Sequence, residues 1–394
     1  MSLPELYIGM KTLITLLALA CGCATAESPL PMAPAPGKTI RVGAVQPKSR
    51  LIDWRLKDAS EVLARVDASL GELEGLVRKA GESGCDVVAL PEDTLGLGLW
   101  EEAPHANLGD VLPRAVDRLI DRLGKAAAAH RMYLVCCSDT FDSGAVRNTA
   151  FFLGRNGREI GRYHKVNMPI HELYKKRGEG FPVFPTPDLG TVGMLICYDM
   201  VFPEAARCLA LGGADIIFHP TLGGAAMGDA DISLAAFRTR AVENYVYVVV
   251  SQRGMGTMIL SPQGKVLAKA EGKDEIITVD IDPASGRAGG DSMNHQDDMR
   301  ARLFRERSPQ AFSMITRIDP PVLKKVPETI TVEEAVRIGR SGHTEGEARF
   351  NDAAKLARDG KKDDAIQAYE ALIVEYPRTW IDRVSRERIA DLRK

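Results

Sequence analysis

The sequence has little net charge, few histidines and no metal-binding spacing. Its 394 residues carry a formal charge of −2, so it has no basic excess of the kind that binds nucleic acid. The seven histidines are scattered, and His171-Glu172 lacks a second histidine at position 175, which is Lys175. The glycine clusters at residues 95–99 and 254–256 lack the pattern of a nucleotide-binding loop. We therefore expect no metal, no cofactor and no nucleic-acid partner.

Long hydrophobic runs are also lacking. The apolar stretch at residues 12–20 is too short to span a membrane comfortably, and an Ala-Thr-Ala cleavage pattern follows it. We therefore predict a signal peptide over residues 1–26 and a proline-containing flexible tether over residues 27–37. The protein is expected to be exported, as a periplasmic or secreted protein. A loose lipobox ending at Cys21 leaves a membrane-anchored lipoprotein as an alternative.

Cysteine spacing does not suggest a small disulfide scaffold. Without the signal peptide, five cysteines remain, and they lie in predicted strands and helices. Export would favour disulfides, yet we expect structural and mostly reduced thiols. Cys197 is the one expected to be prone to oxidation.

Cys197 lies where the apolar strand-like run 192–196 ends and a helix is about to begin. Pro203 suits a first helical position, and Gly212-Gly213 would end that helix. A thiol placed there is expected to be exposed, with its pKa lowered by the positive end of the helix. The alternative is a small buried hydrophobe at the end of a strand.

A glutamate and a lysine occupy similar positions. Glu92 follows the short apolar strand 86–90, and Lys165 closes the second strand of a hairpin predicted from Asn156-Gly157. Catalytic groups in layered α/β folds gather at such strand ends. Taken singly, Glu92 could cap a helix and Lys165 could be a solvated charge.

The ordered set of motifs resembles the nitrilase superfamily of carbon–nitrogen hydrolases. The resemblance covers residues 38–315, and the blocks that carry it are Gly43-Ala44-Val45-Gln46, Leu90-Pro91-Glu92, Arg147-Asn148-Thr149-Ala150, Tyr163-His164-Lys165, Ile196-Cys197-Tyr198-Asp199, Phe202-Pro203-Glu204 and Arg240-Ala241-Val242-Glu243-Asn244. Alternation of strands and helices already indicates an α/β fold. The resemblance implies a four-layer α-β-β-α sandwich that forms homodimers or higher homo-oligomers, with residues 300–315 as an arm on the partner subunit.

The resemblance also implies a mechanism. Glu92 would act as the base for the Cys197 thiol, and Lys165 and the backbone N–H of Tyr198 would stabilise the oxyanion. Ammonia or an amine would leave, and water would hydrolyse the thioester. A second glutamate orients the lysine in many family members, and Glu172 matches it better than Glu179.

The residues around the nucleophile indicate a substrate class. Tyr198-Asp199 resembles the amidase and carbamoylase branches, whereas nitrilases usually have Trp-Glu there, so we expect a linear amide or N-carbamoyl substrate. Asn167 departs from the family, which often has histidine at that position. Candidate substrate-binding residues at the pocket rim are Tyr174, Arg177, Asp199, Thr221 and Leu222, with Asp199 equally able to hold the turn.

The last fifty residues differ from the rest. Gly360, Ala365, Tyr369, Leu372 and Pro377 resemble the second half of a tetratricopeptide repeat, with its first helix at residues 345–359. We predict a linker over residues 316–343 and a small α-helical hairpin over residues 344–394. This module could bind a protein partner, pack on the hydrolase domain, pair with another copy of the chain or be an ordinary helical cap.

Two other classes of function stay open at this stage. The same thioester could be passed to an amine, which would make the protein an N-acyltransferase. Alternatively, the chain could be a non-catalytic binding or scaffold protein dominated by its helical tail. The intact set of Glu92, Lys165 and Cys197 favours the hydrolase.

Overall fold

The computed structural model describes residues 38–103, 105–223, 230–284, 299–326, 331, 345–377 and 380–394. The predicted signal peptide and tether lie outside these residues, as does most of the predicted linker. None of the helices in the described part is long and apolar enough to cross a membrane.

The first sheet has six strands and contributes the strands that precede Glu92 and Lys165. Strand β2 pairs in parallel with β1 on one side and with β3 on the other, and all other pairs in this sheet are antiparallel. In spatial order the strands are β12 (Glu275–Ile281), β1 (Ile40–Gln46), β2 (Val87–Ala89), β3 (Tyr133–Asp142), β4 (Ala145–Leu153) and β5 (Glu159–His164). The β4–β5 hairpin turns at Asn156-Gly157 as predicted, and Gly157 has a φ of 75°, which glycine adopts without strain.

The second sheet also has six strands, and Cys197 lies shortly after one of them, β7. Strands β7, β8 and β9 run parallel, and the flanking pairs are antiparallel. In spatial order the strands are β11 (Val266–Lys269), β10 (Met258–Leu260), β9 (Tyr247–Gln252), β8 (Ile216–Thr221), β7 (Thr191–Met194) and β6 (Val183–Pro185). The Ser251 hydroxyl on β9 donates to the carbonyl of Val45 on β1 at 2.7 Å, which joins the two sheets.

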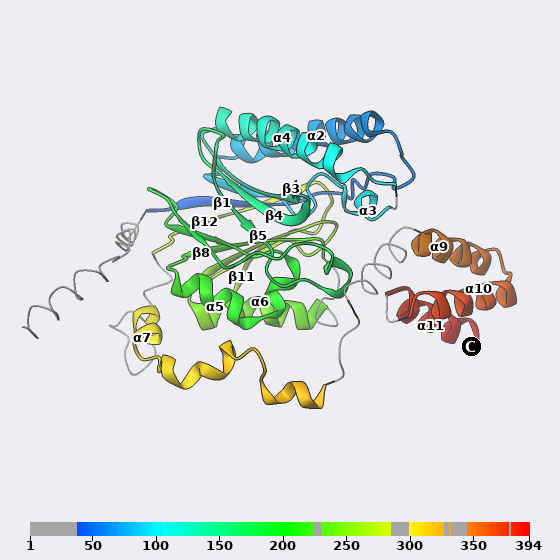
Figure 1. Cartoon of the computed structure of the whole chain (residues 1–394). Coiled ribbons are helices and arrows are strands. Elements are labelled where there is room, and N and C mark those ends of the chain that lie inside the picture. Colours follow the sequence, from blue (N-terminus) through cyan, green and yellow to red (C-terminus); the bar gives the residue numbers. More distant parts are fainter. Residues whose placement is uncertain are drawn as a thin grey trace, which may run out of the picture. The chain divides into compact units, whose positions relative to one another are not determined.

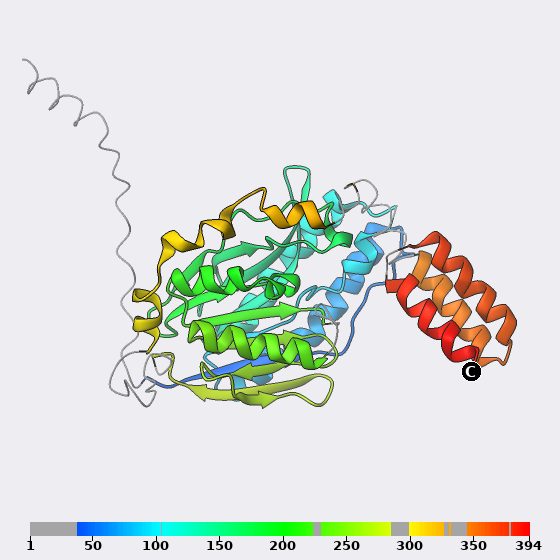
Figure 2. The same ribbon diagram turned by 90° about the horizontal axis from the view of Figure 1, so that it is seen from below.

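Helices cover the outer face of each sheet (Figures 1 and 2). Helices α2 (Ala59–Glu82) and α4 (Leu108–Ala129) lie on the first sheet, and α5 (Pro203–Leu211) and α6 (Ala230–Asn244) lie on the second. Helix α2 begins at Asp58, whose carboxylate accepts from the backbone N–H groups of Ser60 and Glu61. Its buried residues recur at helical spacing, as the sequence predicted.

Three apolar cores separate the four layers. One lies between the first helix pair and its sheet, one lies between the two sheets, and one lies between the second sheet and α5 and α6. The predicted four-layer α-β-β-α sandwich is therefore confirmed. Three short helical segments near the strand ends complete the main domain: α3 (Gly98–Glu101), η1 (Ile170–Glu172) and η2 (Cys197–Val201).

The segment after the sandwich is poor in buried side chains. Helix α7 (Met299–Arg305) is held by Arg300, whose guanidinium donates to Asp215 at 2.6 Å. The following 3-10 segments, η3 (Pro309–Thr316) and η4 (Pro321–Lys325), bury none of their side chains. Apolar residues exposed here are Phe312, Met314, Ile315, Ile318, Val322, Leu323 and Val326, with Ile318 at 95%.

The C-terminal module consists of three helices rather than the predicted hairpin of two. They are α9 (Glu345–Arg358), α10 (Lys362–Glu375) and α11 (Trp380–Leu392), which pack around their own apolar core. Ala365, Tyr369 and Leu372 lie in that core, as the repeat-like pattern predicted. The additional helix α11 contributes Ile381 and Ile389 to it.

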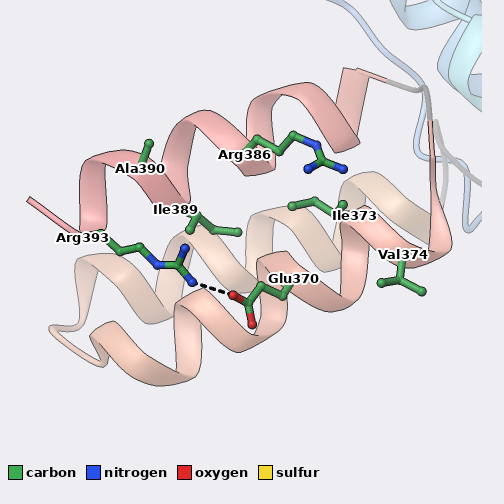
Figure 3. Close-up of a pocket in the computed structure, with 7 residues that line it drawn as sticks. All are labelled: Glu370, Ile373, Val374, Arg386, Ile389, Ala390 and Arg393. Atoms are coloured by element: carbon green, nitrogen blue, oxygen red, sulfur yellow. Dashed lines mark hydrogen bonds and ion pairs between the residues drawn. The ribbon is translucent and has the colours of Figure 1, made fainter.

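A groove of roughly 450 Å³ runs between α10 and α11 (Figure 3). Ile373, Val374, Ile389 and Ala390 line it, together with Arg386 and an ion pair of 2.7 Å between Arg393 and Glu370. The idea that this module binds a protein partner stays a prediction.

Candidate active site

Glu92 lies buried just after β2 and accepts three hydrogen bonds. Its Oε1 accepts hydrogen bonds from the side-chain amide of Asn148 at 2.8 Å and from the ammonium of Lys165 at 3.1 Å. Its Oε2 accepts a hydrogen bond from the backbone N–H of Leu222 at 2.9 Å. The residue is 2% exposed. Donors from three elements therefore fix the direction in which this carboxylate points.

Lys165 follows β5 and lies between two carboxylates. Its Nζ is 3.1 Å from Glu92 and 2.8 Å from Glu172, and its side chain is fully buried. Burial alone would lower the pKa of this ammonium, but Glu92 and Glu172 outweigh burial, so the pKa is raised well above its usual value. Lys165 is thus a fixed positive charge at neutral pH.

Glu172 is the second glutamate that the structure brings to this lysine. It lies in η1 and is buried, whereas Glu179 is exposed. Glu92, Lys165 and Glu172 therefore form one buried ionic group, in which Glu92 is distant in the sequence from the other two.

Cys197 opens η2 with a φ of 43°, a left-handed conformation that is unfavourable for a residue other than glycine. Its thiol lies near the side chain of Thr221, the last residue of β8. The expectation of a lowered thiol pKa is wrong. Burial and the negative charge of Glu92 outweigh Lys165 and Thr221, and they raise the pKa of Cys197 to about 12.

A raised pKa predicts how the thiol reacts. Only the thiolate is alkylated, so the rate of Cys197 alkylation by iodoacetamide should rise about tenfold per pH unit from pH ~7 to ~10 without levelling off. The rate is followed on the Cys197 peptide by mass spectrometry, with the exposed Cys208 as an internal comparison. A plateau of the Cys197 rate near pH ~8 would contradict the raised pKa.

Asp199 holds the turn after the nucleophile. Its carboxylate accepts from the Tyr163 hydroxyl at 2.7 Å, from the backbone N–H of Ile196 at 3.0 Å and from Asn167 at 2.8 and 3.0 Å. Because these partners occupy both oxygens of a fully buried side chain, Asp199 is not a substrate ligand. Asn167, the departure from the family pattern, serves the same turn.

The other predicted rim residues lie in different surroundings. Thr221 contacts Cys197, and Leu222 contributes its backbone N–H to Glu92. The guanidinium of the exposed Arg177 donates to the carbonyl of Val166 at 3.2 Å. The ring of the half-buried Tyr174 lies beside Lys175, whose Nζ is 5.6 Å from the ring centroid. Tyr198 packs edge-on against Phe202.

Sequence reasoning missed the roles of two groups at this site. Asn148 was noted only as part of a motif, but its side chain orients Glu92. The backbone N–H of Leu222 gave no signal at all, since a main-chain donor leaves no trace in residue identity. Of the described residues, no three histidine, cysteine, aspartate or glutamate side chains gather in a metal-binding arrangement, and the five described cysteines are free.

A four-layer sandwich with a thiol, a buried ammonium and two carboxylates at its strand ends defines a class of thiol hydrolase. The chain belongs to the carbon–nitrogen hydrolase family, whose model matches residues 41–289, more than half of the sequence. The resemblance found in the motifs is therefore confirmed, and the protein is an amidase-like hydrolase of the nitrilase superfamily.

Similar proteins of known name include amidases. The deaminated glutathione amidase of Synechocystis sp. is 30% identical over 242 residues, which cover 55% of this chain and 86% of that protein. A nitrilase of Pyrococcus abyssi is 32% identical over 232 residues, covering 55% and 84%. The human omega-amidase NIT2 is 28% identical over 230 residues, covering 52% and 80%.

Solved structures share the fold. An amidase from Nesterenkonia sp. AN1 superposes with a TM-score of 0.53 at 22% identity, covering 70% of this chain and 98% of that one. The C. elegans NitFhit protein gives a TM-score of 0.56 at 21% identity, covering 72% and 67%. At this identity the likeness concerns the fold alone.

Proposed function

We propose that this protein hydrolyses a linear amide or N-carbamoyl group of a small molecule through a thioester on Cys197. The observation that carries the proposal is the buried Lys165 ammonium between Glu92 and Glu172, with its charge acting on the Cys197 thiol. Such a fixed cation suits the oxygen of an attacked carbonyl, which becomes negative only in the transition state.

Acylation begins with a protonated thiol, because the pKa of Cys197 is raised to about 12. Glu92 takes the thiol proton while the sulfur bonds to the amide carbon. The carbonyl oxygen becomes an oxyanion beside the Lys165 ammonium and the backbone N–H of Tyr198. When the oxyanion collapses, the C–N bond breaks, and Glu92 returns the proton to the leaving nitrogen.

Deacylation repeats these roles with water. Glu92 takes a proton from a water molecule, which attacks the thioester carbon. The second oxyanion forms beside Lys165 and collapses with breakage of the C–S bond. The proton on Glu92 then returns to Cys197, which regenerates the free enzyme. An amide substrate gives a carboxylic acid, and an N-carbamoyl substrate gives carbamic acid, which decomposes to carbon dioxide and ammonia.

The substrate class rests on the turn after the nucleophile and on the relatives. Tyr198-Asp199 follows Cys197, as in the amidase and carbamoylase branches. Two of the similar proteins are named for amides, the deaminated glutathione amidase and omega-amidase NIT2. We therefore favour an amide or N-carbamoyl substrate over a nitrile.

Ammonia release from a substrate panel tests this proposal. The purified protein is given ω-amides, aliphatic amides, N-carbamoyl amino acids and the matching nitriles, with a Cys197→Ala variant as the control. We expect turnover of at least one amide or carbamoyl compound, and none in the variant. Conversion of nitriles without any amide would overturn the substrate class, and turnover that persists in the variant would exclude Cys197 as nucleophile.

We also propose that the protein is exported after cleavage near residue 26. The support is the short apolar stretch at residues 12–20 and the small-residue pattern that follows it. Cell fractionation with N-terminal sequencing of the mature protein tests this. An intact N-terminus on protein from the cytosol would contradict export, and a lipid on Cys21 would identify the anchored form.

We further propose that two copies associate through the segment at residues 309–326. Seven large apolar side chains of this segment are exposed in the single chain, an arrangement that favours burial against another protein surface. Sedimentation equilibrium of the wild type and an Ile315→Asp variant tests the idea. A wild-type protein that stays monomeric at micromolar concentration would contradict it.

A further inference from the structure

A second buried ionic group lies next to the catalytic one and takes no part in the chemistry described above. The ammonium of Lys175 pairs with the carboxylate of Asp139, and their side chains are only 8% and 6% exposed. Glu101, on α3, is 1% exposed, and the charge of Asp139 acts on its carboxyl group. Charged groups are seldom buried without a structural or functional reason.

We propose that Lys175 and Asp139 are positioning residues that hold Glu172 against Lys165. The inference rests on the proposed function, since it concerns the lysine that would stabilise the oxyanion. It assigns a role to an ion pair that does not itself reach the reacting atoms.

The first support is the weakness of the turn that carries Glu172. Segment η1 has only three residues, and its Ile170 is 42% exposed, so this side chain adds little apolar packing to the turn. The backbone N–H of Glu172 donates to the carbonyl of Pro169 at 2.9 Å. The backbone N–H of Leu173 donates to the carbonyl of Ile170 at 3.5 Å, which is long for a hydrogen bond. Such a turn needs an anchor if the 2.8 Å contact between Glu172 and Lys165 is to persist.

Lys175 provides that anchor on the C-terminal side of the turn. Its backbone N–H donates to the carbonyl of Glu172 at 2.9 Å, so the two residues move together. Its side chain is fixed by Asp139, which lies on β3 in the first sheet. The ion pair thus ties an irregular segment to a rigid strand.

The second support is the place of Asp139 in the sheet. Asp139 lies directly opposite Asn148 in the β3–β4 ladder, and residues paired in this way project on the same face. Asn148 donates to Glu92 at 2.8 Å. Two paired positions on β3 and β4 therefore support the site. Asn148 holds the Glu92 carboxylate, and Asp139 holds Lys175 and with it the turn that carries Glu172.

These contacts close a ring around the catalytic lysine. The ring runs from Glu92 to Lys165 and Glu172, then through the turn to Lys175 and Asp139, and back across the strand pair to Asn148. The carboxyl group of Glu101 is buried near this ring, and burial and the charge of Asp139 raise its pKa.

Removal of the Lys175 charge should act on turnover rather than on substrate affinity. With its anchor lost, Glu172 no longer fixes the Lys165 ammonium, and misplacement of a catalytic group by about 1 Å can lower the rate about 100-fold. We expect Lys175→Met to lower kcat by about 100-fold on the amide identified by the substrate panel, with KM changed by less than about threefold.

The matched control is Lys176→Met. Lys176 is adjacent and exposed, and its backbone N–H donates to the carbonyl of Val146, a bond that the substitution keeps. This variant should retain wild-type kcat and KM. Because Lys175→Met leaves Asp139 without its cation and could fail to fold, the double variant Lys175→Met/Asp139→Asn is made as well. It removes both charges, and we expect it to fold and to keep the low kcat.

Two readouts decide the inference. If the wild type is active, the inference is overturned by a kcat of the double variant within about threefold of the wild-type value. It is also overturned if the double variant changes only KM. If the wild type releases no ammonia from any amide, the proposed function fails. The inference about Lys175 and Asp139 is then tested by the alkylation rate of Cys197. Displacement of Lys165 raises the pKa of the thiol, so the double variant should be alkylated more slowly than wild type and Lys176→Met. An unchanged alkylation rate would then overturn the inference.

Discussion

Replacement of Cys197 by alanine is expected to lower kcat by about 10⁴-fold or more on any amide substrate. The substitution removes the only atom that forms the thioester, so the remaining groups can do no more than polarise a bound carbonyl. A serine in its place should be nearly as inactive. A hydroxyl is a weaker acid than a thiol, and the burial that raises the pKa of Cys197 to about 12 also acts on a hydroxyl.

Folding should survive this change. The side chain of Cys197 is small, and alanine tolerates the φ of 43° about as well as cysteine does. Turnover is measured together with a thermal unfolding scan, and Cys208→Ala on the exposed face of α5 serves as the control. A Cys197→Ala protein with more than about 1% of wild-type kcat would refute the thioester mechanism.

Replacement of Lys165 by methionine is expected to affect both catalysis and folding. Loss of one oxyanion donor typically costs about 100- to 1,000-fold in kcat. The same change leaves Glu92 and Glu172 buried without their shared cation, which should lower the free energy of unfolding by about 3–5 kcal/mol. No exposed lysine should produce either effect, and Lys176→Met again provides the comparison.

The two effects of Lys165→Met can be separated. A Lys165→Met/Glu172→Gln double variant carries one buried carboxylate fewer, so it should regain part of the lost stability without regaining kcat. The difference in free energy of unfolding between wild type and Lys165→Met should also become smaller as the pH falls. Carboxylates left without a cation have raised pKa values, so they take up protons in the folded state. Urea unfolding at several pH values measures both. A Lys165→Met protein as stable as wild type at neutral pH would contradict the ionic group described for the site.

Local sequence signals predicted most of the framework correctly. The spacing of apolar residues predicted α2, and Asn156-Gly157 predicted the β4–β5 hairpin. Helix α5 begins at Pro203 and ends at Gly212, as expected. These features depend on neighbours in the chain, so residue identity is enough to find them. The C-terminal module shows the limit, since no short-range motif indicated that α11 completes the core of α9 and α10.

The protonation state of the nucleophile could not be predicted in this way. Its position before a helix suggested a thiolate, yet burial and the charge of Glu92 raise its pKa to about 12. Both influences arise from residues that are distant in the chain and close in space. Asp199 is a similar case, because only the fold shows that Tyr163 and Asn167 occupy its carboxylate.

The sequence by itself determined the family and the layered α/β fold, and its motifs point to Glu92, Lys165, Cys197 and Glu172 as the candidate catalytic residues. The tertiary structure alone decided how these groups are charged and held. Asn148, Asp139 and Lys175 are brought to the site by pairing across two strands and a turn, and pairing of distant segments sets both the burial and the Coulomb energy of each group.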